Sequence, residues 1–162
     1  MRALLAAAVG AAALAAAGSA APAAGPIVSG VAGVDPITGE RVSLDRWRGR
    51  PVAVNAWASW CAGCRDEAAA LRRLARAHPG SLLGIDFKDS RAGARLFYRR
   101  YGFSHPSIFD PKGKLVFRIR AIGLPATVFL DRDHRIAHSI SGAATFAQLS
   151  EGWRRARRTT RR

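Results

Sequence analysis

The sequence predicts an α/β fold in which helices cover the faces of a β-sheet. Apolar runs of strand length alternate along the chain with longer segments whose apolar residues recur at helical spacing. Short clusters rich in Gly, Pro and Asp separate these segments and mark turns. Near the C-terminus, two strand-like runs are joined by a turn and followed by a final helix. This order is typical of a sheet with helices packed on its faces.

Residues 1–24 have the pattern of a targeting segment. Arg2 supplies a short positive region, Ala3–Ala17 is apolar, and small residues close the run, so cleavage after Ala20 is expected of a signal peptide. The alternative is an uncleaved N-terminal membrane anchor, because Ala3–Ala24 reaches the roughly 20 residues that span a bilayer. Glycines, a proline and the weak hydropathy of alanine favour cleavage. In both cases the folded domain is expected outside the cytoplasm, where disulfides persist.

The chain after this segment predicts short strands that lead into a long helix. A weak strand, a short strand, a helical turn and a buried central strand are expected in that order at Ile27–Val34, Arg41–Leu44, Leu44–Trp47 and Pro51–Trp57. Two cysteines follow, and then a helix runs to about Ala77, with Leu71 and Leu74 on its apolar face. The sequence His-Pro-Gly ends this helix.

The second half of the chain continues the alternation. The expected helix at Arg91–Tyr101 turns Leu96 and Phe97 inward and ends at a glycine. Thr145 is the expected N-cap of the last helix. The remaining elements are strands, except for one segment that fits a short helix or a strand; in chain order they are Ser81–Phe87, Ser107–Phe109, Leu115–Ile122 (helix or strand), Ala126–Leu130 and Ile136–Ser141, with the last helix at Phe146–Arg158.

Cys61 and Cys64 form a CxxC motif where a buried strand meets a helix. Backbone N–H groups at a helix N-terminus are unpaired and carry partial positive charge, which stabilises a thiolate there. Only the thiolate attacks a disulfide. Cys61 stands at the open end of the helix and Cys64 one turn deeper. We therefore expect Cys61 to attack and Cys64 to resolve the mixed disulfide.

Other uses of the two cysteines are weaker. A four-residue loop gains only about 2 kcal/mol from cross-linking, so a purely structural bridge is a poor explanation. A structural zinc site needs four Cys or His ligands, and the four histidines show no ligand spacing near the motif. A c-type haem site needs His after the second cysteine, where this chain has Arg65. We expect no metal and no organic cofactor besides the redox-active disulfide.

Glu67 and Pro125 are further candidates for the site. Glu67 follows Cys64 by three positions, so it lies on the same side of the helix and could move a proton during resolution. The alternative is an exposed first-turn acid that complements the helix dipole, as expected of Asp66. Pro125 precedes a strand and follows Gly123, and its peptide bond could be cis or trans on sequence alone.

Three segments of this chain resemble the TlpA/ResA-type thioredoxin-like proteins, a group that includes the CcmG/DsbE proteins. These segments are Asn55–Glu67 around the cysteines, Phe109–Lys114, and Gly123–Asp133, and they occur in the family's order and spacing. The similarity covers roughly Ile27 to Leu149. It implies a thioredoxin-like fold with a central mixed β-sheet flanked by helices and extra N-terminal strands.

The resemblance also implies roles for single residues. It implies that Pro125 is cis and faces the disulfide, that Glu67 tunes the cysteines, and that Trp60 and Leu124 contact the substrate. Asn55 occupies the position where ordinary thioredoxins bury an Asp. Two features depart from the family: the residues between the cysteines are Ala62-Gly63 without a proline, and no proline follows the carboxylate. The first departure leaves the reduction potential open.

The chain is strongly basic, with 26 Lys and Arg against 11 Asp and Glu and a net charge of +15. Nucleic-acid binding is the weaker interpretation, because no stripe of stacking aromatics accompanies the charges. Contact with anionic lipid or cell-wall phosphate explains them as well. We expect a thioredoxin-like domain at residues 25–150 and a basic C-terminal tail at residues 151–162, where arginines are dense.

The sequence therefore predicts an extracytoplasmic thiol–disulfide oxidoreductase, located in the periplasm, the cell envelope or the secreted fraction. We expect it to reduce disulfides, with cytochrome c maturation as the implied process. The expected partners are protein thiols and disulfides, apocytochrome c among them, and a membrane thiol-redox protein. An exported oxidase or isomerase is an alternative, and a non-enzymatic thioredoxin-like adaptor is another.

Overall fold

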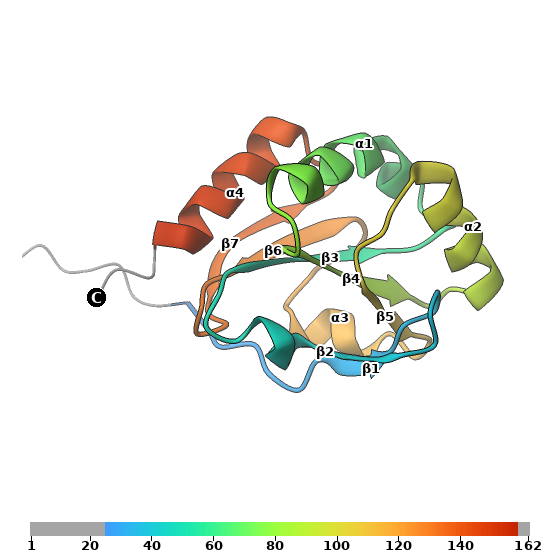
Figure 1. Cartoon of the computed structure of the whole chain (residues 1–162), viewed down its shortest axis with the longest axis horizontal. Helices are drawn as coiled ribbons and strands as arrows, with labels where there is room; N and C mark the ends of the chain where they lie inside the picture. Colours follow the sequence, from blue (N-terminus) through green and yellow to red (C-terminus); the bar gives the residue numbers. More distant parts are fainter. Residues whose placement is uncertain (1–24, 159–162) are drawn as a thin grey trace, which may run out of the picture.

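The computed structural model describes residues 25–158 and contains a five-stranded mixed sheet (Figure 1). The strand order is β5-β4-β3-β6-β7. β3, β4 and β5 are mutually parallel, whereas β6 and β7 are antiparallel to their neighbours. The strands are β3 (Val52–Trp57), β4 (Leu82–Phe87), β5 (Ser107–Asp110), β6 (Ala126–Leu130) and β7 (Ile136–Ser141).

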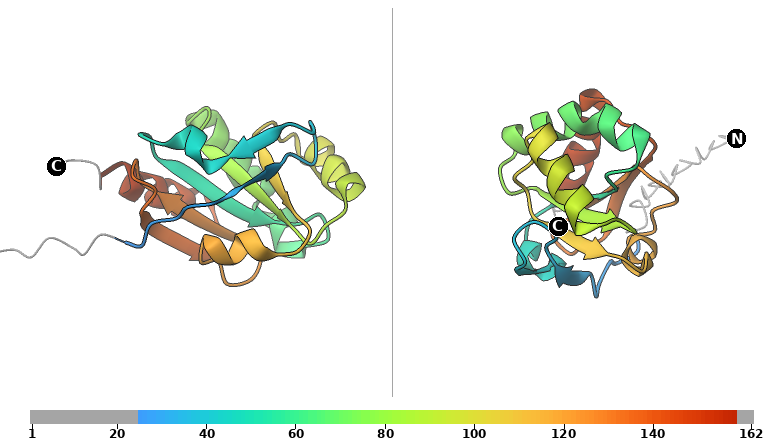
Figure 2. Two further views of the ribbon diagram at one scale, coloured as in Figure 1. Left: turned by 90° about the horizontal axis from the view of Figure 1, so that it is seen from below. Right: turned by 90° about the vertical axis from the view of Figure 1, so that its right-hand side faces the viewer.

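Two layers cover the sheet, as the side view in Figure 2 shows. The long helices lie on one face. The parallel steps from β3 to β4 and from β4 to β5 place their two connecting helices on the same side of the sheet, and the C-terminal helix packs beside the first of them. These helices are α1 (Ala62–Ala77), α2 (Arg91–Tyr101) and α4 (Phe146–Arg158). The other face carries a small antiparallel ribbon and two short helices, namely β1 (Ala32–Val34), β2 (Arg41–Ser43), the 3-10 helix η1 (Leu44–Trp47) and α3 (Lys114–Arg118).

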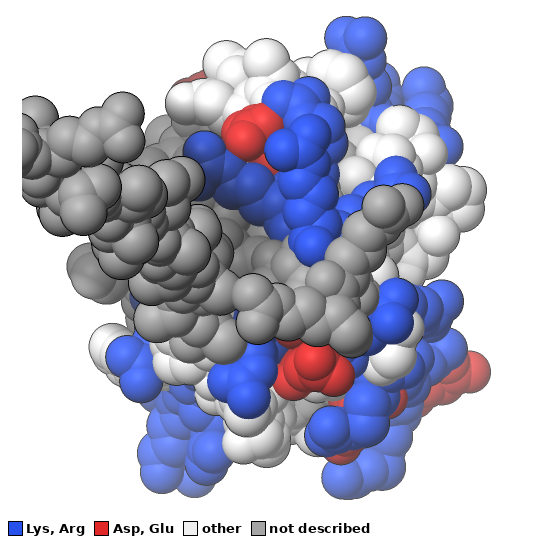
Figure 3. Space-filling model, turned by 90° about the vertical axis from the view of Figure 1, so that its left-hand side faces the viewer, with Lys and Arg blue, Asp and Glu red and all other residues white. Residues whose placement is uncertain are grey.

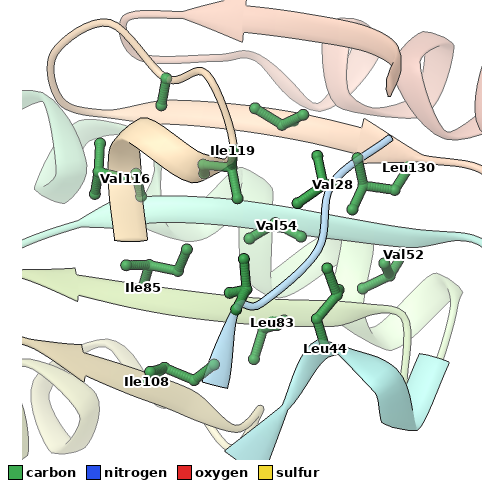
Figure 4. Packing of buried hydrophobic residues seen from close by; sticks show 14 of the residues in the cluster. Val28, Leu44, Val52, Val54, Leu83, Ile85, Ile108, Val116, Ile119 and Leu130 are labelled. Carbon is green, nitrogen blue, oxygen red and sulfur yellow. The ribbon is translucent and has the colours of Figure 1, made fainter. Parts of the chain in front are cut away.

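Alternation along the strands divides the core between the two faces. Val52 and Val54 of β3 belong to the cluster under the ribbon and α3, where Figure 4 shows them with Leu44 and Val116. Ala53, between them, belongs to the cluster that Leu71 and Leu74 of α1 and Leu149 and Trp153 of α4 complete. The central strand is buried over its whole length, as its apolar composition predicts.

The structure confirms the predicted fold class and most of the elements. α2, η1, β6, β7 and α4 have the bounds expected from the sequence, and the long helix ends at Ala77. The segment Leu115–Ile122, which fitted a helix or a strand, is helical only in its first half, because α3 ends at Arg118. The weak N-terminal strand is shorter than expected: only Ala32–Val34 pairs as a strand, and Ile27 makes an isolated bridge to Arg135.

Two expectations were wrong. Leu96 is 59% exposed, because α2 presents Ala94, Phe97 and Tyr98 to the core and Leu96 lies off that stripe. The folded domain also continues past residue 150 to Arg158, because the last turns of α4 bury Trp153 and Ala156. Most of the expected basic tail is therefore part of a packed helix.

Residues 1–24 lie outside the described part of the chain, so the targeting segment stays a prediction. Within residues 25–158, no helix has the length and apolar character needed to cross a bilayer. No group of three or more His, Cys, Asp or Glu side chains in the same range is arranged to hold a metal ion.

Candidate functional site

Cys61 and Cys64 form a disulfide at the N-terminus of α1, with their Cα atoms 5.3 Å apart. Cys61 is the N-cap, and its sulfur accepts a hydrogen bond from the backbone N–H of Cys64 at 3.1 Å. Cys61 is 6% exposed and Cys64 is 2% exposed, so both are less accessible than their position after a loop suggests. Cys61 is the more exposed of the two. Its neighbour Trp60 is 56% exposed and marks the site on the surface.

Asp89 holds the loop that leads into the disulfide. Its carboxylate accepts hydrogen bonds from the backbone N–H of Ser59 at 2.6 Å and from the Ser59 hydroxyl at 2.8 Å. The indole N–H of Trp60 donates to the carbonyl of Lys88 at 3.2 Å. The loop after β4 thereby fixes the residues just before Cys61. Sequence reasoning did not find Asp89, because its partner lies 30 positions away along the chain.

Pro125 lies against the turn that contains the disulfide. A Cβ atom built on Gly63 would be 3.0 Å from Cδ of Pro125, so this turn and the proline are in close contact. The Leu124–Pro125 peptide bond is cis, as the resemblance implied. Leu124 is partly buried and packs against the cluster that contains both cysteines. The structure thus brings Pro125 and Leu124 to the same place as Cys61 and Cys64.

Glu67 is buried behind the disulfide rather than exposed on the first turn. It is 1% exposed, whereas Asp66 is exposed. Its carboxylate accepts hydrogen bonds from Asn55 at 2.9 Å and from the backbone N–H of Ala144 at 3.1 Å. Burial raises the pKa of Glu67 to about 7, against the lowering effect of these two hydrogen bonds. The group can therefore exist in both protonation states near neutral pH.

A second buried acid, Asp86, lies at the end of β4. Its side chain is fully buried, and its carboxyl group lies beside the carboxyl group of Asp89. Burial raises its pKa to about 8, and the charges of Asp89, Asp110 and Asp35 add to the rise. It pairs in register with Trp57, four residues before Cys61. Sequence reasoning missed this residue, although an Asp inside an apolar strand run is a signal that could have found it.

This arrangement defines a class of protein. A disulfide at a helix N-terminus, a proline packed on it and a mixed sheet behind it are the parts of a thioredoxin-like thiol–disulfide oxidoreductase. The chain belongs to the AhpC/TSA family, whose model matches residues 31–139.

Relatives and solved structures agree with this class. The chain is 38% identical over 95 residues to the thiol:disulfide interchange protein DsbE of Allochromatium vinosum, covering 58% of this chain and 52% of that one. It therefore spans only about half the length of that relative. It is 24% identical over 121 residues to the thiol-disulfide oxidoreductase ResA of Bacillus thuringiensis subsp. konkukian, covering 73% and 70%.

Two solved structures share the architecture. A DsbF homologue from Corynebacterium diphtheriae superimposes with a TM-score of 0.74 at 27% identity, covering 88% of this chain and 98% of that one. A secreted thiol-disulfide isomerase from Corynebacterium glutamicum gives a TM-score of 0.66 at 27% identity, covering 76% and 81%. The chain thus shares its fold with a DsbF homologue and with a thiol-disulfide isomerase.

Proposed function

We propose that this protein reduces disulfides of other proteins on the extracytoplasmic side of the membrane, with the CxxCH cysteines of apocytochrome c as its substrate. The observation that carries the proposal is the buried Glu67 three positions after Cys64, on the same side of α1 as the disulfide. A structural bridge needs no such group, whereas a reductase must remove a proton from a shielded thiol. The similarity to DsbE and ResA supports this choice.

The reaction begins from the reduced protein. The Cys61 thiolate attacks one sulfur of the substrate disulfide, the substrate bond breaks, and the departing thiolate takes up a proton. Cys64 then gives its proton to the ionised carboxylate of Glu67 and attacks the Cys61 sulfur. The bond between Cys61 and the substrate breaks, and the second substrate sulfur leaves as a thiolate that takes up the proton held by Glu67 or one from water. Two electrons have then passed to the substrate, and Cys61 and Cys64 are joined as in the structure. A dithiol partner, which we propose is a membrane thiol-redox protein, restores the reduced form.

The fold supports this sequence of steps at each cysteine. The N-terminal end of α1 stabilises the Cys61 thiolate through its partial positive charge. Trp60, more than half exposed, and Leu124, beside Pro125, supply the apolar contacts for a peptide around the substrate cysteine. Because Cys64 is nearly inaccessible, external disulfides meet Cys61 first.

The test measures the reduction potential of the purified protein against glutathione and its rate with an oxidised CxxCH peptide. A potential below that of the glutathione pool and reduction of the peptide support the proposal. In the same assay, Cys64→Ser should accumulate the mixed disulfide through Cys61, while Cys61→Ser should not. Equal trapping by both variants would contradict the assignment of the attacking thiol.

An oxidase or isomerase is the second candidate. The likeness to a secreted thiol-disulfide isomerase favours it, and the Ala62-Gly63 pair between the cysteines leaves the reduction potential open. Because 30 mV corresponds to about 1.4 kcal/mol for this couple, a small change at the helix end can reverse the direction of electron flow. A potential well above that of glutathione, with oxidation of reduced substrates, would select this candidate.

A further inference from the structure

A basic pocket lies at the end of the molecule opposite the disulfide. Its volume is about 380 Å³, and its lining includes Arg50, His78, Ser81, Trp153 and Arg157. The lining comes from the segment before β3, the turn between α1 and β4, and the last turns of α4. α1 starts at the disulfide and ends at this pocket; its 16 residues rise about 24 Å at 1.5 Å per residue. A ligand here would leave the redox site free.

Two arginines give the pocket its charge. Arg50 and Arg157 both line it, and its lining contains no Asp or Glu. Among residues 25–158, the ion pairs of the structure join Asp45 and Glu151 to other arginines. Arg50 donates one hydrogen bond, to the carbonyl of Arg46 at 3.3 Å, which leaves most of its guanidinium donors unused. The positive charge of the pocket is therefore not neutralised by its own walls.

Two further donors in the lining are buried without a partner. Within residues 25–158, the hydroxyl of Ser81 and the indole N–H of Trp153 have no hydrogen-bond partner, and their residues are only 4% and 7% exposed. Leaving such groups unpaired is unfavourable, since folding removes them from water. The ring of His78 stacks on Trp153 with centroids 4.9 Å apart. Burial and the nearby charge of Arg157 lower the pKa of His78, so its neutral ring keeps one N–H donor at pH 7.

The C-terminus of α1 offers a simpler reason for the two arginines. Its free carbonyls carry partial negative charge, which attracts cations. That effect accounts for positive charge near His78, but it provides no partner for the donors of Ser81 and Trp153. It also leaves most guanidinium donors of Arg50 unused, and these can bind an anion in the pocket.

We propose that this pocket binds a phosphate group, held by the guanidinium groups of Arg50 and Arg157. Planar guanidinium groups match phosphate oxygens in pairs of parallel hydrogen bonds. The bearer of the phosphate is an anionic lipid headgroup. The described chain begins and ends at this side of the molecule (Figure 1), and arginine and lysine side chains predominate on its surface there (Figure 3).

The first experiment titrates inorganic phosphate into the purified protein at constant ionic strength and follows the imidazole resonances of His78. A saturable shift, with a rise in the pKa of His78, is expected because a dianion beside the ring favours its protonated form. Arg157→Gln and Arg50→Gln should each weaken binding about tenfold. The matched control is Arg158→Gln, which removes the same charge from the same helix but does not line the pocket.

The second experiment tests whether the bound phosphate belongs to a lipid headgroup or to a soluble compound. Vesicles of phosphatidylglycerol and of phosphatidylcholine are sedimented with the protein, with and without free phosphate as competitor. Retention on phosphatidylglycerol that Arg157→Gln abolishes and phosphate displaces identifies the lipid headgroup. Saturation by free phosphate without vesicle binding assigns the site to a soluble phosphate compound. A linear, unsaturable shift, or equal weakening by Arg158→Gln, shows general charge screening and overturns the proposal.

Discussion

Burial makes Glu67 and Asp86 unusual acids. Glu67 lies in α1 and Asp86 near the end of β4, and both side chains are buried. Desolvation is the main cause of both raised pKa values. They differ in their partners: Glu67 accepts two hydrogen bonds that lower its pKa, whereas the neighbouring carboxyl of Asp89 raises the pKa of Asp86 further. Glu67 therefore ionises first as pH rises and is the better placed to take a proton from Cys64.

Replacing Glu67 should change the titration of the thiols. An ionised carboxylate one helical turn from Cys64 disfavours its thiolate, so Glu67→Gln should lower the pH at which the cysteines become reactive by about one unit. The measurement is the pH dependence of alkylation of the reduced protein between pH 5 and 10. Asp66→Asn is the control, since Asp66 is exposed on the same helix. Identical profiles for Glu67→Gln and the wild type would leave Glu67 with a packing role only.

The same two acids should make stability depend on pH. Because the folded-state pKa values of about 7 and about 8 exceed the usual values of 4.5 and 3.8, the folded state binds more protons between these limits. The free energy of unfolding should therefore fall as pH rises from about 4 to 8, by on the order of 3 kcal/mol from Glu67 alone. Urea unfolding at pH 5 and pH 8 measures this difference.

Substitutions at Glu67 and Asp86 separate the pH dependence of stability that these acids cause from that caused by the histidines. Burial lowers the pKa of His105 to about 4. Its contribution to the free energy of unfolding therefore has the opposite pH dependence and is lost as pH falls below about 6.5. Glu67→Gln and Asp86→Asn should each reduce the loss of stability between pH 5 and 8, whatever the slope of the wild type. If both variants keep the wild-type slope, the two acids are ionised in the folded protein at pH 5.

The packing of α4 on the sheet depends on a close approach at Gly152. A Cβ atom at this position would clash with the ring of Phe129, which is a fully buried residue of β6. Glycine is ordinarily a poor helix residue, so its presence here is explained by the space that Phe129 requires. The same helix supplies Trp153 and Arg157 to the phosphate pocket.

Gly152→Ala should destabilise the protein, although alanine favours helices. The clash must be relieved by moving Phe129 or the helix, at a cost of about 1–3 kcal/mol, which exceeds the gain in helix propensity of about 1 kcal/mol. Thermal or urea unfolding measures the change. Arg154→Ala, at an exposed position of α4, should alter stability by less than about 1 kcal/mol. An increase in stability for Gly152→Ala would mean that the helix and Phe129 separate at little cost.

The charge of the whole molecule should select among substrates. A net charge of +15 attracts anionic peptides over distances longer than a single contact. Two oxidised CxxCH peptides that differ only in flanking Glu or Lys residues should therefore be reduced at different rates, the acidic one about tenfold faster at low salt. The ratio should approach one at high salt, because the screening length shrinks from about 30 Å at 0.01 M to about 3 Å at 1 M. Equal rates at 0.01 M would show that the net positive charge of the protein does not attract peptides to the end of the molecule that carries the disulfide.

The sequence predicted the elements well where the signal is local. The helical spacing of α1 and α4, the alternation of turns and strands, and the capping residue Thr145 are all properties of neighbouring residues. Leu96 shows the limit of this reasoning, because an apolar residue one step from Phe97 was taken as buried when the helix turned it outward. The end of the domain was misplaced for a related reason, since a run of arginines hides the buried face of α4.

The sequence by itself determined that this protein carries a CxxC pair at a strand–helix junction of an α/β fold, because spacing and periodicity are recorded in adjacent residues. Only the tertiary structure decided that Glu67 is buried against Asn55 and Ala144, that Asp86 lies beside Asp89, and that Asp89 holds Ser59. It likewise assembled the pocket of Arg50, Ser81 and Arg157 from three distant segments. These properties depend on desolvation and on contacts between segments far apart in the chain, which no local pattern specifies.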